Sequence, residues 1–300
     1  MISKISLGTV QFGKDYGISN TKGKVSKKEV FEILDYAKAA GINSLDTAFS
    51  YGTSEAVIGE YLRGKGADFN IISKFPSIGR DKPGNIEEVL KQSIQKLGTS
   101  SLYGYLLHQF SDVLEDNNIW DSLVHLKQSG LVEKIGFSVY SPEDLILLLE
   151  KGIDFDIIQV PYSIFDQRFD AYFPELKRKG IEVYSRSVFL QGLYFLSLDG
   201  LDCQFDSARE KLEALNRIAQ ESEISIQHLC LGYALLNAGI DHVIIGVDSI
   251  AQLKSDLKVE QEIDVVKNAY DQLKSLRMED ENILLPYLWK QNKELVEKNR

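Results

Sequence analysis

The chain has 300 residues, of which 44% are hydrophobic and 26% are charged, and its formal net charge is −10. This size and composition are typical of one large globular domain. The acidic balance, without a run of Lys and Arg, argues against a nucleic-acid interface or an anionic membrane surface. Any anionic ligand must therefore be bound by a local site.

Neither the cysteines nor the apolar segments indicate a secreted or membrane protein. Cys203 and Cys230 are too few and too unpatterned for a disulfide framework or a zinc site, so we expect no metal. The first residues, MISKISLGTV, lack the apolar core of a signal peptide. No run approaches the roughly 18 apolar residues of a spanning helix. We therefore predict a cytoplasmic protein, monomeric or a small homo-oligomer, with no nucleic-acid or membrane partner.

Short strand-like runs alternate with helical patterns along the chain. The predicted strands are residues 5–9, 44–47, 70–74, 103–108, 134–139, 156–160, 182–185 and 242–246. The first predicted helix, 27–40, follows Ser26, a fitting N-cap with Glu29 three residues on, and ends at Gly41. Further helices are predicted at 86–97, 119–129, 142–151 and 171–179, each followed by a glycine.

This rhythm is typical of repeated βα units. Runs such as DIIQV and HVIIG are continuously apolar, as expected for parallel strands covered on both faces. Eight strands in one series predict an α/β fold, a (β/α)8 TIM barrel forming a single domain over residues 1–277; an open doubly wound sheet is the alternative. Residues 278–300 are richer in charge, and we expect them to form a loose tail or a flap over the barrel rim.

Ionisable side chains stand at the ends of three consecutive predicted strands. Asp46 ends the second, Lys74 the third and His108 the fourth, while Tyr51 follows shortly after Asp46. Each residue alone has an ordinary structural explanation, such as a helix cap, a solvated lysine or a hydrogen-bonded core histidine. In a closed barrel, however, the carboxyl ends of the strands form one rim, where catalytic sites lie. The four residues together therefore predict an active site.

The same four residues carry a family resemblance. Their order in the segments DTAFSYG, ISKF and YLLHQF closely resembles the aldo-keto reductase superfamily, and the resemblance extends from LGTVQFG through IIGVDS. It implies a reductase of aldehydes or ketones, or an alcohol dehydrogenase, that uses NADP(H), or in some members NAD(H), without a Rossmann fold. The chain contains no GxGxxG opening a βαβ unit, which agrees.

Carbonyl reduction needs a hydride at carbon and a proton at oxygen. Tyr51 can donate that proton, but an ordinary phenol has a pKa near 10. A cation about 4 Å away, at an effective dielectric of about 20, is worth roughly 4 kcal/mol. We therefore expect Lys74, held by Asp46, to lower the pKa of Tyr51, with burial opposing part of the shift. His108 is expected to donate a hydrogen bond to the substrate oxygen.

The resemblance also implies cofactor-binding positions. Ser138 and Gln159 match residues that bind the nicotinamide carboxamide, with Val139 where many relatives have Asn, and Tyr184 matches an aromatic residue that stacks on the ring. Residues expected around the nicotinamide are Gly8, Thr9, Val10 and Asp46. Residues expected near the pyrophosphate are Ser185, Arg186, Ser187, Gln191 and Gly192.

The eighth strand leads into a helix whose first N–H groups are expected to bind phosphate. The cofactor residues predicted there are Gly246, Val247, Asp248 and Gln252. Many relatives that prefer NADPH place Lys or Arg in this turn, whereas here the nearest cation is Lys254. An inward Asp248 would repel a 2′-phosphate and favour NADH.

Aromatic residues in loops near the strand ends are expected to enclose a sugar-like or apolar carbonyl substrate. They are Phe12, Tyr16, Phe49, Phe75, Phe110, Tyr140 and Phe189. Two other functions fit the same catalytic residues: a redox-sensing regulatory subunit that holds the cofactor with little turnover, and an aldolase with Lys74 as Schiff-base lysine. Oxidation of NAD(P)H by an aldehyde distinguishes the reductase from the sensor, and borohydride trapping identifies the aldolase.

Overall fold

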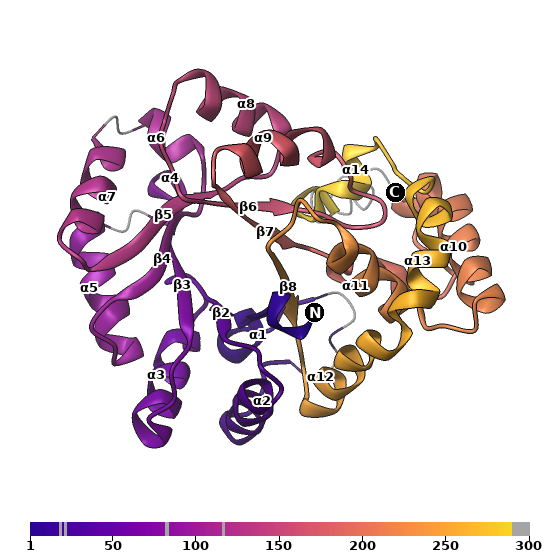
Figure 1. Ribbon diagram of the computed structural model, residues 1–300, viewed down its shortest axis with the longest axis horizontal. Coiled ribbons are helices and arrows are strands. Elements are labelled where there is room, and N and C mark those ends of the chain that lie inside the picture. The colour runs from indigo at the N-terminus through magenta and orange to yellow at the C-terminus, as the bar shows by residue number, and fades with distance from the viewer. Residues whose placement is uncertain (18–19, 21–22, 82–83, 116–117, 290–300) are drawn as a thin grey trace, which may run out of the picture.

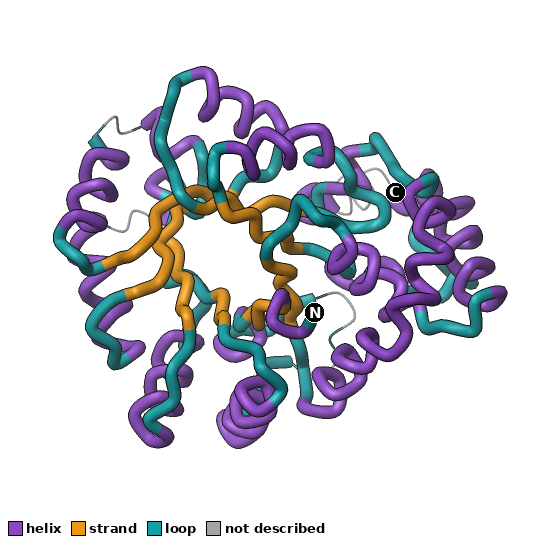
Figure 2. Tube along the Cα trace, viewed as in Figure 1, coloured by secondary structure: helices purple, strands orange, loops and turns teal. Residues whose placement is uncertain are grey.

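The structure, a computed structural model, describes residues 1–17, 20, 23–81, 84–115 and 118–289. Eight parallel strands form a closed barrel in chain order, with β1 hydrogen-bonded to both β2 and β8 (Figures 1 and 2). The strands are β1 (Ile5–Gly8), β2 (Ser44–Asp46), β3 (Asn70–Phe75), β4 (Leu102–Leu107), β5 (Val132–Ser138), β6 (Ile157–Pro161), β7 (Glu182–Arg186) and β8 (His242–Gly246). The predicted (β/α)8 barrel is confirmed, and the doubly wound alternative is wrong.

Helices surround this barrel on its outside (Figure 2). They are α1 (Val10–Gly13), α2 (Lys27–Ala39), α3 (Ser54–Lys65), α4 (Ile78–Asp81), α5 (Ile86–Leu97), α6 (Ser111–Glu115), α7 (Ile119–Gln128), α8 (Pro142–Glu150), α9 (Phe173–Arg178), α10 (Arg209–Glu221), α11 (Ile226–Leu236), α12 (Ile250–Asp256), α13 (Ile263–Lys274) and α14 (Glu281–Leu284). Short 3₁₀ helices add η1 (Ile2–Lys4), η2 (Asp170–Tyr172), η3 (Leu190–Phe195), η4 (Cys203–Ala208) and η5 (Leu257–Glu262).

Local sequence signals explain where these helices begin and end. The Ser26 hydroxyl accepts from the Glu29 N–H at 3.3 Å, so the predicted cap of α2 is confirmed. Gly98 ends α5 in the left-handed region, at φ +70°, where a side chain would be strained.

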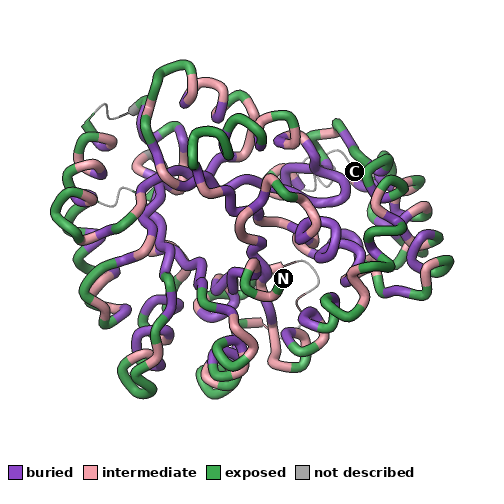
Figure 3. The backbone as a smooth tube through the Cα atoms, in the orientation of Figure 1, coloured by how far each residue is buried: buried purple, intermediate pink, exposed green. Residues whose placement is uncertain are grey.

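The apolar residues form two separate layers. Inside the barrel, one small cluster fills the space between the strands: Ile72, Leu106, Ile157, Tyr184 and Ile244. The larger cluster lies between the strands and the helices, so the strands are buried almost throughout (Figure 3). Burial on both faces is the reason that the strand sequences are continuously apolar rather than alternating.

The first part of the predicted tail packs against the rest of the chain. Met278 donates its N–H to the Phe165 carbonyl at 2.9 Å, and the Trp289 indole lies edge-on to Phe205, with ring centroids 5.0 Å apart. Ile283 is fully buried. Residues 278–289 are therefore not loose. Residues 290–300 lie outside the described residues, and the division of the chain at 277 stays a prediction.

No helix in the described ranges has the length and apolar character needed to cross a membrane. Within the same ranges, no three His, Cys, Asp or Glu side chains are grouped as a metal site.

Candidate active site

A cavity opens at the carboxyl ends of the strands. The terminal residues of five strands line it: Gly8, Asp46, Ser138, Arg186 and Gly246. The other predicted site residues that line it are Thr9, Val10, Tyr51, His108, Gln159, Ser187, Gln191, Gly192, Asp248 and Gln252.

A buried ion pair lies beneath this cavity. The Lys74 ammonium donates to both carboxylate oxygens of Asp46, at 2.7 and 2.8 Å, and to the Thr47 carbonyl at 2.9 Å. Lys74 is 0% exposed and is not among the described residues that line the cavity. Burial lowers the pKa of Lys74, and the Asp46 carboxylate opposes that shift. Because Lys74 is fully buried and does not line the cavity, its amine has no direct access to a substrate carbonyl there, which argues against the aldolase hypothesis.

Backbone packing holds Tyr51 at the cavity wall. Its N–H donates to the Ala48 carbonyl at 2.9 Å, and its carbonyl accepts from the Ser54 N–H at 3.1 Å. Gly13 lies so close that an added Cβ would be 1.7 Å from the Tyr51 carbonyl oxygen. The second glycine of LGTVQFG, Gly13, therefore lets α1 pack closely against the loop that carries Tyr51.

The Tyr51 ring stands between the ion pair and the imidazole. The Lys74 ammonium lies 5.3 Å from the centroid of the Tyr51 ring. The His108 ring lies edge-on to the phenol ring, with centroids 6.0 Å apart at 75°. The three strand-end residues and the tyrosine thus meet at one place, with Tyr51 and His108 facing the cavity and Lys74 behind them.

The expected direction of the Tyr51 pKa shift is wrong. Burial raises the pKa of Tyr51 well above its usual value, and the Asp46 carboxylate raises it further, while the Arg186 guanidinium lowers it. Lys74 is neutralised by the same Asp46, so its charge is not available to acidify the phenol. Tyr51 is consequently a protonated hydrogen-bond donor at neutral pH.

Two side-chain amides line the cavity and differ in their hydrogen bonding. Gln159 donates from Nε2 to Asp46 at 2.8 Å, and its Oε1 lies 3.5 Å from the Ser138 hydroxyl. Gln11, which sequence reasoning missed, lines the cavity with its side-chain Oε1 buried and without a hydrogen-bond partner in the described part of the chain. A buried acceptor left unpaired costs free energy, so Gln11 marks a position where a ligand donor would be accommodated.

The sequence of this chain matches a known protein family. The profile of the aldo/keto reductase family matches residues 4–278. This chain belongs to the aldo/keto reductase family. It is 25% identical over 281 residues to the uncharacterized oxidoreductase YqkF of Bacillus subtilis, covering 86% of this chain and 87% of that protein.

Two further relatives cover most of the chain. L-galactose dehydrogenase of Arabidopsis thaliana is 24% identical, over 94% of this chain and 88% of that protein. Among solved structures, the holo form of aldo-keto reductase AKR11C1 from Bacillus halodurans superposes with a TM-score of 0.68 at 24% identity, covering 88% of this chain and 91% of that one. This likeness agrees with the closed barrel.

Some predicted cofactor residues of this aldo/keto reductase do not face the cavity. The Tyr184 ring stacks on His242, with centroids 4.3 Å apart at 17°, inside the barrel. Ser185 and Val247 are fully buried and are likewise outside the cavity lining. Tyr184 therefore does not line this cavity, because it lies two residues before the end of β7 in the barrel interior, whereas Arg186, on the same face of the strand, lies at the rim.

The start of α12 also differs from expectation. The Ile250 N–H donates to the Glu29 carboxylate at 3.2 Å, and the Gln252 N–H donates to the Ser249 hydroxyl at 3.2 Å. The Asp248 N–H donates to the Gln252 side chain at 2.9 Å. Three of the N–H groups expected to bind phosphate thus have partners within the chain, and one partner is itself an anion.

The predicted aromatic residues divide into two groups. Tyr16, Tyr140 and Phe189 line the cavity, together with Phe195, which was not predicted. The others, Phe12, Phe49, Phe75 and Phe110, pack in or against the layer between barrel and helices. Of these aromatic residues, those that reach the cavity come from the segments that follow β1, β5 and β7.

Proposed function

We propose that this aldo/keto reductase reduces an aldehyde or ketone to an alcohol with NADP(H), or alternatively NAD(H), as hydride donor, and that Tyr51 is the proton donor. The observation that carries the proposal is the meeting of Tyr51 and His108 at the cavity wall, over the buried Lys74–Asp46 pair. We further propose a cytoplasmic protein, monomeric or a small homo-oligomer, that acts on small molecules without a nucleic-acid or membrane partner.

The polar groups of the cavity fit a nicotinamide dinucleotide. When bound, such a cofactor supplies the hydride that reduces the carbonyl carbon. The unpartnered Gln11 Oε1 offers an acceptor for an amide or hydroxyl donor, and the Ser138 hydroxyl and the Gln159 amide can bind a carboxamide. Residues that would complete this binding surface are Gly8, Thr9, Val10, Ser187, Gln191, Gly192, Gly246, Asp248 and Gln252.

In the proposed reaction, Tyr51 donates a hydrogen bond, and then its proton, to the substrate oxygen. Its raised pKa keeps the phenol protonated, so the proton is available when negative charge develops on the substrate oxygen. His108 would donate the second hydrogen bond that polarises the carbonyl. Asp46 and Lys74 form the buried floor of the site beside Tyr51.

The test combines cofactor titration with turnover. Fluorescence titration with NADPH and NADH is followed by a carbonyl panel with the preferred nucleotide, for wild type, Tyr51→Phe and Tyr105→Phe. Tyr105 is a matched control because its buried hydroxyl has no partner in the described residues and lies outside the cavity lining. We expect Tyr51→Phe to bind cofactor normally and lose turnover, and Tyr105→Phe to retain both.

Other outcomes contradict the proposal in different ways. An active Tyr51→Phe enzyme would remove the phenol from the mechanism. Tight nucleotide binding by wild type without turnover of any carbonyl would favour the redox-sensing role. Absence of binding below roughly millimolar for both nucleotides would exclude both functions.

A further inference from the structure

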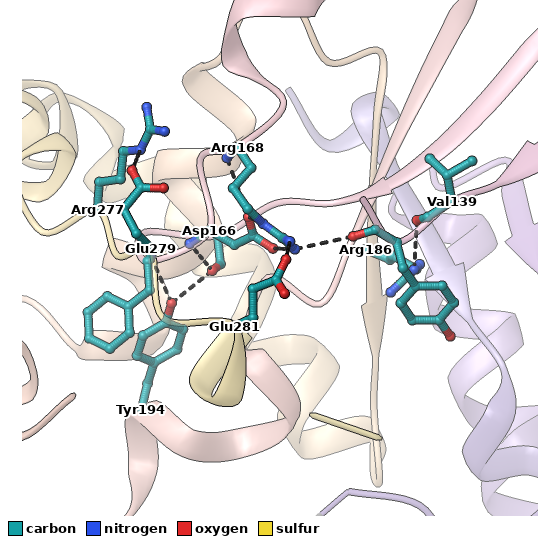
Figure 4. A network of polar contacts seen from close by, with 11 residues as sticks. Val139, Asp166, Arg168, Arg186, Tyr194, Arg277, Glu279 and Glu281 are labelled. Carbon is teal, nitrogen blue, oxygen red and sulfur yellow. Dashed lines mark hydrogen bonds and ion pairs between the residues drawn. The ribbon is translucent and has the colours of Figure 1, made fainter. Parts of the chain in front are cut away.

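Arg186 places a cation in the wall of the cavity. It is the last residue of β7, and it is the single Lys or Arg among the described residues that line the cavity. Its Nη2 donates to the Val139 carbonyl at 3.0 Å and its Nη1 lies 3.4 Å from the Ser187 hydroxyl (Figure 4). The guanidinium carbon lies 4.1 Å from the centroid of the Tyr140 ring.

This guanidinium has no anionic partner in the described part of the chain. None of the ion pairs there includes Arg186, and both of its hydrogen bonds go to neutral oxygens. The nearby Asp46 carboxylate is already neutralised by Lys74. A guanidinium has five N–H donors, so donors remain for a ligand. This part of the cavity therefore carries a net positive charge without a counter-charge from the protein.

The supports of Arg186 are rigid. Arg168 donates from Nη2 to the Tyr140 carbonyl at 3.2 Å, and it is itself held by two 2.9 Å contacts to the buried Asp166 carboxylate (Figure 4). On its outer side the Tyr140 ring meets Tyr287 edge-on, with centroids 5.6 Å apart. A positioned ring beneath the guanidinium reduces the entropy lost when an anion binds to it.

The position of Arg186 favours the substrate over the cofactor phosphates. Its guanidinium stacks on Tyr140, one of the aromatic residues expected to enclose the substrate. It also lines the same cavity as Tyr51, whose pKa it lowers, so the charge lies in the part of the cavity that contains the reacting phenol.

We propose that Arg186 binds a carboxylate of the carbonyl substrate, so that the preferred substrates are aldehydes or ketones that carry a carboxylate group. The planar two-oxygen group matches the guanidinium fork. A dianionic phosphate would call for a second cation, which the described lining lacks. This inference rests on the proposed reductase function and adds its substrate class.

The test compares two aldehydes of nearly equal size, 4-carboxybenzaldehyde and methyl 4-formylbenzoate, which differ in charge. We expect wild-type kcat/KM to be about tenfold or more higher for the carboxylate, as one charge-assisted hydrogen bond predicts. Arg186→Gln should abolish that preference, and Arg186→Lys should retain part of it. Arg178→Gln, at an exposed position, is the matched control and should behave as wild type.

Three results would overturn the inference while leaving the reductase function intact. The first is an equal wild-type kcat/KM for the two aldehydes, and the second is an unchanged preference for the carboxylate in Arg186→Gln. The third is a weakening of NAD(P)H binding by about tenfold in Arg186→Gln, which would assign the guanidinium to the cofactor. If neither aldehyde is turned over, the proposed function has failed instead. Benzoate titration of wild type and Arg186→Gln then decides the anion site: tighter binding by wild type supports it, and equal binding refutes it.

Discussion

Gln159 donates a hydrogen bond of 2.8 Å to Oδ1 of Asp46, the same oxygen that binds the Lys74 ammonium at 2.7 Å. An amide from β6 therefore supports an ion pair formed between β2 and β3, across the inside of the barrel. Oδ1 thus accepts from both donors and Oδ2 accepts from Lys74 at 2.8 Å, and together these contacts fix the orientation of the carboxylate. This arrangement couples the proposed carboxamide site to the floor beneath Tyr51.

The ion pair should matter for folding as well as for activity. Asp46→Asn leaves the fully buried Lys74 cation without its counter-charge, so we expect the free energy of unfolding to fall by about 3–5 kcal/mol. Chemical denaturation measures this. The control is Asp264→Asn, which breaks an exposed pair with Lys267 and should cost at most about 1 kcal/mol. An equal loss of unfolding free energy in the two variants would mean that the charge of Lys74 is neutralised without Asp46.

Asp248 should influence which cofactor binds. It lines the cavity, and Lys254, the cation expected nearby, instead lies 5.2 Å from the Tyr36 ring and is outside the cavity lining. Asp248→Asn removes a negative charge that disfavours a 2′-phosphate. We expect NADPH to bind about fivefold more tightly and NADH to be unchanged, since one such contact is worth about 1 kcal/mol. Titration of both nucleotides decides it, and an equal change for both would remove Asp248 from cofactor discrimination.

We expect Gln11 to bind the cofactor and to lower the stability of the fold. Its buried Oε1 has no partner in the described residues, and Gly246 is placed so that an added Cβ would lie 2.5 Å from the Gln11 amide nitrogen. Gln11→Leu removes the unpaired acceptor, so we expect equal or higher stability together with about tenfold weaker cofactor binding. Tyr105→Phe, which also removes an unpaired polar atom, should leave binding unchanged. A lower free energy of unfolding with unchanged cofactor affinity in Gln11→Leu would mean that Gln11 has only a structural role.

Asp256 should make stability depend on pH. Burial raises the pKa of Asp256 to about 7, against partial opposition from the Gln227 hydrogen bond and from His228. Because this acid has a higher pKa in the folded than in the unfolded state, the folded state is favoured while the group is protonated. That advantage is lost as the pH rises from about 4 to about 7, by up to roughly 4 kcal/mol for a shift of this size.

The corresponding experiment compares unfolding of wild type and Asp256→Asn at pH 5 and pH 8. The variant keeps an oxygen that can accept from Gln227 and carries no charge, so its stability relative to wild type should rise between the two values. Asp264→Asn, at an exposed site, should follow wild type at both. A constant difference between wild type and Asp256→Asn would show that Asp256 does not titrate in this range.

Short-range signals in the sequence determined the barrel and the place of its site. Continuous apolar runs such as DIIQV, glycines after helices, and the Ser26 cap are local patterns, and each corresponds to an element of the structure. The gathering of Asp46, Lys74 and His108 followed from the same reasoning, because parallel strands in a closed barrel all end at one rim.

Tertiary structure alone decided how the side chains at that rim are used. Glu29 binds the Ile250 N–H although 221 residues separate them, and no local pattern announces that contact. Tyr184 and Arg186 lie on the same face of β7, and only the position of the rim along the strand leaves Tyr184 in the barrel interior and Arg186 in the cavity wall. The direction of the Tyr51 pKa shift depends on how much water the surrounding chain excludes and on Asp46 neutralising Lys74, and both are properties of the packed barrel rather than of spacing.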